Sequence, residues 1–163
     1  MRVRIGPYRK NRAEKIEIEK FDTWSMDATL ALIIHPMLIQ LKETTHGAPV
    51  VSLEDVPEHL HATEESIAKY LESGESDESF FDRWDYVLDE MIFAFKSKNE
   101  DWEQQFYSGE HDMQWIERDD GMGQMVYGPN NTFKVDVERL SAYQDRISNG
   151  FRLFGKYYEN LWD

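Results

Sequence analysis

The sequence predicts an α+β fold that is predominantly helical, with three main helices in the core and a small antiparallel sheet beside them. Three observations lead to this prediction. Apolar residues recur at helical spacing in three long segments, 25–43, 79–97 and 137–161. Short stretches of alternating polar and apolar residues lie outside these segments. No repeat or linker-like composition divides the chain, so residues 1–163 are expected to form a single domain.

Two short strands are expected before the first helix. Residues 2–5 and 15–21 each alternate polar and apolar side chains, and Gly6-Pro7 ends the first stretch. Alternation places the apolar residues of a strand on one face. The two strands therefore provide one part of the predicted sheet.

The first long helix is densely apolar. Its apolar stripe is nearly all-round between residues 28 and 38, which predicts a central position in the fold. Pro36 removes one backbone hydrogen bond and predicts a kink or break near residues 32–36. The apolar run is too short to span a bilayer and contains His35, so no membrane span is expected.

The second and third long helices each carry one broad apolar stripe. Asp136 can cap the third helix. Gly150 and Gly155 lie inside that helix, where each glycine lowers helix stability by roughly 1 kcal/mol relative to Ala. Close packing of another element is a reason to have glycine there, so we expect such packing at both positions. The side chains expected to be largely buried come from all three helices: Leu30, Ile34, Trp84, Leu88, Met91, Phe151 and Phe154.

A hairpin is expected between the second and third long helices. Asp120-Gly121 is a turn dipeptide, and alternating residues flank it at 113–119 and 124–128. Residues 132–136 form a candidate third strand. These segments supply the rest of the predicted sheet.

Charge and cysteine content narrow the classes of partner. The net charge is −14, so the chain is expected to bind neither nucleic acid nor an anionic membrane. The exception is a basic cluster within residues 2–20, which can form a local anion site. The chain has no cysteine, which excludes disulfides, thiolate metal sites and cysteine nucleophiles. The N-terminus has no apolar signal core, so export is not expected.

Several segments, in order along the chain, carry a family resemblance. They are RVRIGPY, DTWSMD, LALIIHPMLIQLKETTHGAPVV, EDVPEHL, FDRWDYVLDEMIFAF, EDWEQQF and RISNGFRLFGKYYENLWD, and they cover about two-thirds of the chain. This combination resembles a family of uncharacterised proteins encoded by tailed bacteriophages, in particular large contractile-tailed phages of cyanobacteria and other marine bacteria. The resemblance implies a phage gene product in the host cytoplasm during infection, with a virion location left open. It implies no activity.

The chain departs from the family pattern in two places. An insertion that longer relatives carry before IEIEKF is nearly absent, and the hairpin between residues 113 and 135 is peculiar to this chain. A function that resides in either region does not carry over.

Two Glu-x-x-His spacings raise a metal hypothesis. A pair of such motifs on facing helices builds a di-iron site. Here the motif that ends in His46 lies at a helix end, and the motif that ends in His61 lies in a loop beside Pro57. No cofactor and no tightly bound metal are therefore expected. The alternative is a looser single-metal site, with ligands drawn from His46, Asp55, His59 and His61.

No catalytic motif stands out. The chain has no GxSxG, P-loop or GxGxxG pattern. The acidic residues Asp82, Asp85, Asp89 and Glu90 could act as paired carboxylates, but their helical spacing favours a solvated face. The sequence therefore favours a role other than catalysis.

The C-terminal segment is dense in aromatic residues. Lys156, Tyr157 and Trp162 are the candidate binding residues, and Tyr157 and Trp162 are expected to form an exposed contact patch. The contact can be with another subunit, which leaves a homo-oligomer open, or with a different protein.

Three functions compete at this point. The first is an acidic, phage-encoded interaction protein that binds a basic surface on a host or phage protein. The second is a metal-dependent enzyme that uses the loop from His46 to His61. The third is a virion or assembly component.

Overall fold

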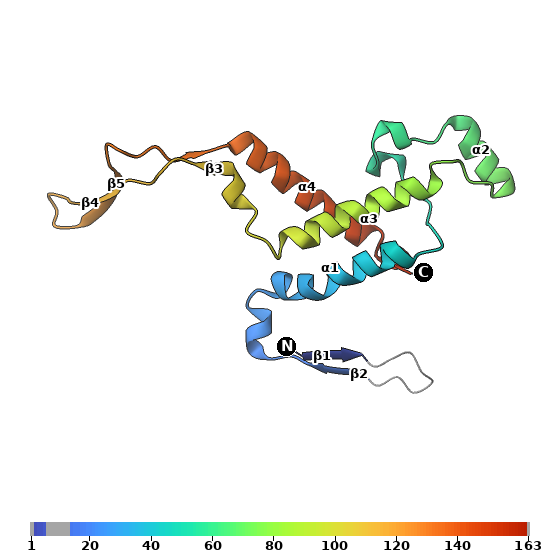
Figure 1. The fold of residues 1–163 in the computed structure, drawn as a ribbon, viewed down its shortest axis with the longest axis horizontal. Helices are drawn as coiled ribbons and strands as arrows, with labels where there is room; N and C mark the ends of the chain where they lie inside the picture. Colours follow the sequence, from blue (N-terminus) through green and yellow to red (C-terminus); the bar gives the residue numbers. More distant parts are fainter. Residues whose placement is uncertain (1, 6–13, 163) are drawn as a thin grey trace.

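The structure of the protein is a computed structural model that describes residues 2–5 and 14–162 (Figure 1). The described part contains four α-helices: α1 (Met26–Thr44), α2 (Glu64–Ser73), α3 (Phe80–Ser97) and α4 (Val137–Lys156). The described part also contains five short 3-10 helices: η1 (Lys20–Thr23), η2 (Leu53–Asp55), η3 (Glu58–Leu60), η4 (Glu103–Phe106) and η5 (Tyr158–Asn160). The strands are β1 (Arg2–Ile5), β2 (Glu14–Glu17), β3 (Tyr107–Ser108), β4 (Met113–Glu117), β5 (Gly123–Tyr127) and β6 (Lys134–Val135). The predicted α+β, mostly helical class is confirmed.

Helix α3 is the centre of the fold, with α1 and α4 packed along it (Figure 1). Its side chains Trp84, Leu88 and Met91 are buried as expected. Phenylalanine pairs extend the core towards α4, since the ring of Phe95 lies 5.1 Å from Phe151 and 4.8 Å from Phe154. The central position predicted for α1 is therefore wrong, because α3 contacts both of the other long helices.

A close approach of two backbones fixes the contact between α3 and α4. A Cβ atom added at Gly150 would lie 2.3 Å from the carbonyl oxygen of Glu90 and 2.5 Å from the Cβ of Ala94. The close packing predicted at Gly150 is confirmed. At Gly155 it is wrong, since no atom lies within 4 Å of an added Cβ.

Helix α1 lies at the edge of the helical layer, where only one of its sides is covered. Ala31 and Leu38 are buried, and Ile34 is half-buried. Leu30 is 40% exposed, so the prediction that it is largely buried is wrong. The helix is unbroken through Pro36. Pro36 is exposed, and the carbonyl that it leaves without a donor, four residues earlier, belongs to a residue on the exposed side.

The strands form three separate antiparallel pairs among the described residues, not one sheet. β1 pairs with β2, which ends at Glu17, and the chain then turns into η1. β4 pairs with β5 as the predicted hairpin. The candidate third strand instead pairs, as β6, with β3. The Gly6-Pro7 turn lies outside the described residues.

The β4–β5 hairpin projects away from the helices (Figure 1). The β3–β6 pair forms its base, where Tyr107 pairs with Val135 and Ser108 with Lys134. At the opposite end of α4, the helix stops at Lys156 and η5 follows, so the third long helix is shorter than predicted. No helix of the described part combines the length and apolarity that crossing a bilayer requires.

Candidate functional site

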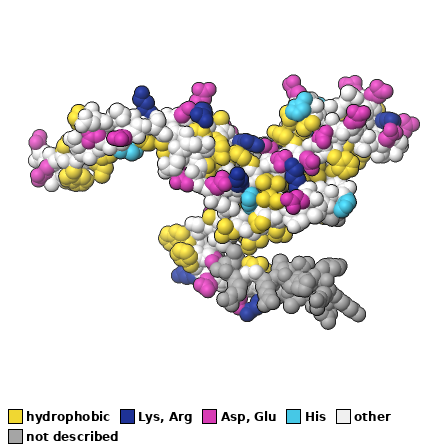
Figure 2. Space-filling model, in the orientation of Figure 1, with side chains coloured by type: hydrophobic (Ala, Val, Ile, Leu, Met, Phe, Trp, Pro, Cys, Tyr) yellow, Lys and Arg dark blue, Asp and Glu magenta, His cyan; other side chains and the backbone are white. Residues whose placement is uncertain are grey.

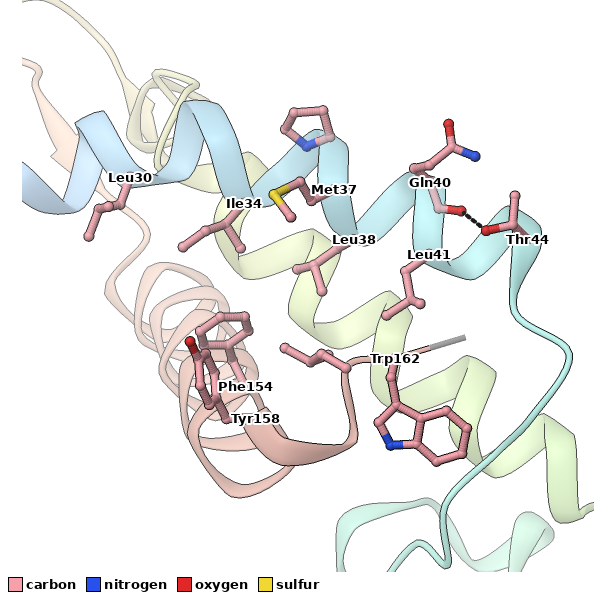
Figure 3. Close-up of a pocket in the computed structure, with 12 residues that line it drawn as sticks. Leu30, Ile34, Met37, Leu38, Gln40, Leu41, Thr44, Phe154, Tyr158 and Trp162 are labelled. Carbon is pink, nitrogen blue, oxygen red and sulfur yellow. Dashed lines mark hydrogen bonds between the residues drawn. The ribbon is translucent and has the colours of Figure 1, made fainter. Parts of the chain in front are cut away.

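An apolar groove lies between α1 and the end of α4. Its volume is about 1060 Å³. We call it the α1–α4 groove. It is lined by Leu30, Ile34, Pro36, Met37, Leu38, Gln40, Leu41, Thr44, Phe154, Tyr158, Leu161 and Trp162. Figure 3 shows the α1 side chains on one side and the aromatic side chains of the C-terminal segment on the other.

The groove exists because α1 is apolar on more sides than the fold covers. Met37 is 62% exposed and Leu32 is 64% exposed, although both are large apolar side chains. On the other wall, Tyr158 and Trp162 are also exposed. Exposed apolar surface of this extent is typical of a contact site.

The lining carries no charge, and two exposed carboxylates adjoin it along the chain. None of the twelve described lining residues is charged. Glu43 and Glu159 are exposed and adjoin lining residues in the sequence. The neighbouring cation, Lys42, is paired with Asp89 of α3, with 2.5 Å between the Lys42 Nζ and Asp89 Oδ1 atoms. The groove is therefore an apolar strip beside exposed carboxylates.

A buried carboxylate lies close to the C-terminal wall of the groove. Asp55 is 5% exposed and is held by three side chains from the end of α4. Arg152 Nη2 donates to Asp55 Oδ1 at 2.6 Å. Lys156 Nζ and the Tyr157 hydroxyl each lie 2.6 Å from Asp55 Oδ2. We call these four residues the Asp55 cluster.

Two further contacts extend the Asp55 cluster. The backbone N–H of Ser52 donates to the Tyr157 hydroxyl at 3.0 Å, and Lys156 Nζ also donates to Glu54 at 2.9 Å. The loop that contains η2 is thereby fastened to the end of α4. The ring of Tyr157 also packs edge-to-face on Trp84, with 5.8 Å between ring centres.

Electrostatics favour the charged forms of Asp55 and Lys156. Burial would raise the pKa of Asp55, but the hydrogen bonds from Lys156, Tyr157 and Arg152 outweigh it and lower that pKa. The hydrogen bond to Asp55 raises the pKa of Lys156. Burial, followed by the hydrogen bond to Asp55, raises the pKa of Tyr157. Because no proton is poised to move near pH 7, the cluster suits a structural role better than acid–base chemistry.

The three predicted binding residues separate into two environments. Trp162 is 55% exposed, as predicted, and lines the α1–α4 groove. Tyr157 is only 4% exposed, so its place in an exposed patch is wrong. Its neighbour Tyr158 lines the groove instead, because the chain leaves the helical conformation at Tyr157. Lys156 belongs to the Asp55 cluster.

Sequence reasoning missed Arg152 and the groove-lining residues of α1. The spacing of Arg152 and Lys156 indicates one helix face, but nothing local names Asp55 as their partner. The exposure of Met37 could not be predicted, because a helix that is apolar on all sides is expected to be buried.

The four candidate metal ligands do not come together. Asp55 is already held by three donors, and the Nε2 atom of His61 lies 3.1 Å from the Val56 carbonyl oxygen. His46 and His59 are exposed. Over residues 2–5 and 14–162 no three His, Asp or Glu side chains are grouped as metal ligands.

The acidic residues of α3 are also divided. Asp82, Asp85 and Asp89 are exposed, as a solvated face requires. Glu90 is 5% exposed. The Arg146 Nε–H is shared between the two Glu90 carboxylate oxygens, and Arg146 Nη2 donates to Oε1, so the place of Glu90 on the solvated face is wrong. It cannot pair with the other carboxylates, because it faces α4.

Comparisons of the chain with models of known protein families, with characterised proteins and with solved structures find no match.

Proposed function

We propose that this chain is an acidic interaction protein that binds an apolar segment of a partner protein in the α1–α4 groove. The observation that carries the proposal is a groove of about 1060 Å³ whose lining is uncharged and largely apolar. This volume slightly exceeds the roughly 300–1,000 Å³ typical of small-molecule pockets. The exposed Met37 and Trp162 at its walls suit a long protein segment better than an enclosed small ligand.

The chemistry of the partner follows from the groove and its surroundings. A helix with apolar residues at positions i, i+4 and i+7 places them in line along one face, which matches a groove that runs along α1. Basic residues beside that face would meet Glu43, Glu159 and the net charge of −14. We infer an amphipathic, basic segment as the occupant.

The cellular setting of the proposal comes from the family resemblance. A phage gene product that binds a basic protein surface would act on a host or phage protein in the infected cell. Most of the binding energy would come from a few apolar side chains, with Trp162 and Met37 as first choices. The acidic surface would mainly raise the association rate, so that rate should fall as ionic strength rises.

Site-specific photo-crosslinking tests the proposal. A photo-reactive phenylalanine analogue at Met37 should crosslink a basic protein in the lysate of infected cells. The same analogue at Gln144, which is exposed on α4 and does not line the groove, is the matched control. Adding Leu30→Glu to the variant that carries the analogue at position 37 should abolish the crosslink. Equal crosslinking from both positions would mean that the groove is not the site.

A second measurement addresses the partner class. Gel-shift assays with duplex and single-stranded nucleic acid should show no binding. Salt-sensitive binding that disappears when Arg9, Lys10 and Arg12 are neutralised would place the function in the basic N-terminal stretch and overturn the proposal.

A further inference from the structure

One wall of the α1–α4 groove lies beyond the end of α4. Tyr158, Leu161 and Trp162 line the groove and follow the last residue of that helix. We call residues 158–162 the C-terminal wall, and Figure 3 shows Tyr158 and Trp162 across the groove from the side chains of α1. Within the wall the backbone N–H of Trp162 donates to the carbonyl oxygen of Asn160 at 2.9 Å. Local bonds of this kind shape the wall, but its position relative to α1 requires an attachment elsewhere.

The chain changes direction at Tyr157, immediately before the C-terminal wall. Its φ of −103° and ψ of 17° end the helical conformation of α4. Because Tyr158 is the next residue, the placement of Tyr157 determines where the wall begins. A displacement of Tyr157 would therefore move the wall relative to α1.

The side chain of Tyr157 is attached at three points. Its hydroxyl donates to Asp55 Oδ2 at 2.6 Å and accepts a hydrogen bond from the backbone N–H of Ser52 at 3.0 Å. Its ring packs edge-to-face on Trp84 of α3. A hydrogen bond to a buried carboxylate is both strong and directional. The hydroxyl is therefore held in one place.

The loop that holds this hydroxyl also contacts the other end of the C-terminal wall. The loop follows Thr44, the last residue of α1, and leads to η2, which contains Asp55. A Cβ atom added at Gly47 of this loop would lie 3.4 Å from the ring of Trp162. One loop thus continues from α1 and meets the wall on both sides, which couples the two walls of the groove.

The other contacts of the C-terminal wall are apolar. The rings of Phe154 and Tyr158 lie 5.7 Å apart, edge-to-face, and Leu161 is half-buried against the core. Apolar packing is not directional, so these contacts permit small displacements that the hydrogen bonds of Tyr157 resist.

Charge does not select where a basic segment would dock. On the face shown in Figure 2, acidic side chains are spread from the β4–β5 hairpin to α2, so their attraction acts over the whole face. The place of binding must then be set by the shape of the apolar groove. The position of its walls is therefore decisive for the function proposed for it.

We propose that Tyr157 is the positioning residue of the α1–α4 groove, whose hydroxyl, held between Asp55 and Ser52, fixes the C-terminal wall relative to α1. Tyr157 is 4% exposed and offers a partner almost no surface, whereas Tyr158 and Trp162 do. A wall that is ordered before binding loses little conformational entropy when a partner docks. This consequence for binding rests on the function proposed for the groove.

A distance measurement across the groove tests the role of Tyr157. Because the chain has no cysteine, Glu43→Cys and Glu159→Cys together place two nitroxide labels on the full chain, one on α1 and one on the C-terminal wall, at exposed positions. Electron paramagnetic resonance measures the distribution of distances between the labels. Tyr157→Phe keeps the ring and removes the hydroxyl, so it should widen and shift this distribution. An unchanged distribution would overturn the proposal.

Two controls separate positioning from a general loss of stability. Tyr107→Phe removes another hydroxyl that donates to a carboxylate, that of Glu103 at 2.9 Å, and should leave the distribution across the groove unchanged. Labels at Asp85→Cys and Gln144→Cys, exposed on α3 and α4, report on the helical layer. Tyr157→Phe should leave this second pair unchanged. Equal widening of both label pairs would mean that Tyr157 stabilises the fold in general and positions no wall.

Photo-crosslinking separates this proposal from the function proposed for the groove. With the photo-reactive analogue at Met37, Tyr157→Phe should lower the yield of the partner crosslink about three- to tenfold, the equivalent of one lost hydrogen bond. If no crosslink forms even when Tyr157 is present, the proposed function fails, and the distances alone decide the role of Tyr157. If the distribution widens and the yield stays the same, the position of the wall does not govern binding, and the inference is wrong.

Discussion

Helices α1 and α3 are similar in length and both are rich in apolar side chains, but the fold covers them to different extents. Nine residues of the 18-residue α3 are buried, whereas only Ala31 and Leu38 are buried in the 19-residue α1. Helix α3 lies between α1 and α4, so its apolar stripe has a partner along both neighbours. Helix α1 has a partner on one side only.

The difference teaches that apolar content and burial are separate properties of a helix. In α3 the apolar surface stabilises the fold, because water is excluded from it. In α1 part of that surface stays in water at Leu32 and Met37, where it contributes little to folding and is available for binding. Substitutions in the two helices should therefore affect different measurements.

The largest effect is expected in α3. Trp84→Ala should lower the free energy of unfolding by about 3–5 kcal/mol, because the side chain is 1% exposed and leaves a large cavity. Urea unfolding followed by circular dichroism measures the change. Trp84→Phe is the control. Its cost should be smaller, because it keeps a ring and removes an indole N–H that has no hydrogen-bond partner among the described residues. If Trp84→Ala lowers the free energy of unfolding by less than about 1 kcal/mol, α3 is not the centre of the core.

The Asp55 cluster should give the next largest effect. Asp55→Asn should cost about 2–3 kcal/mol, since charged hydrogen bonds are lost while Arg152 and Lys156 remain partly solvated. Burial raises the pKa of Asp55, but the hydrogen bonds lower it further, so the folded pKa lies below the unfolded value of about 3.9. The stabilisation from Asp55 is therefore present above the unfolded pKa and is lost as the pH falls through the folded pKa.

Unfolding measured against pH checks this prediction. The wild type and Asp55→Asn should differ at pH 7 and converge in acid. Glu54→Gln is the matched control, because Glu54 is exposed and its pair with Lys156 should contribute only about 0–1 kcal/mol. A constant difference between wild type and Asp55→Asn down to strongly acidic pH would contradict the role of the carboxylate.

A smaller effect is expected at the contact between α3 and α4. Gly150→Ala should cost about 2 kcal/mol, because the new methyl group meets the backbone of Glu90 and the helices must separate. Gly155→Ala in the same helix meets nothing within 4 Å and should instead stabilise by about 0.5–1 kcal/mol. Thermal unfolding of the two variants checks the opposite signs. Equal signs would mean that the close approach at Gly150 does not hold in solution.

The smallest effect on stability is expected in α1. Met37→Ser should change the free energy of unfolding by no more than about 0.5 kcal/mol, because Met37 is 62% exposed. The same substitution should weaken partner binding through the groove. A destabilisation comparable with that of Trp84→Ala would show that the exposed side of α1 is covered within the protein itself.

The sequence by itself determined the elements that depend on neighbouring residues. The three long helices begin within one residue of their predicted starts, and the first two end within one residue of theirs, because helical spacing and caps such as Asp136 are local signals. The β4–β5 hairpin also follows from a local turn and alternating residues. The exposure of Trp162 was also predicted, from the local density of aromatic residues in the C-terminal segment.

Tertiary structure alone decided which surfaces are covered and which polar groups meet. Asp55 is bound by residues about a hundred positions away, and Glu90 by Arg146 from another helix. β6 found a partner in β3 and not in the hairpin. Such contacts depend on how the helices pack, and packing also turned Tyr157 inward while it left Met37 and Trp162 in water. Periodicity reports the apolar sides of a helix, but only the arrangement of the other helices determines which of those sides remains free to bind.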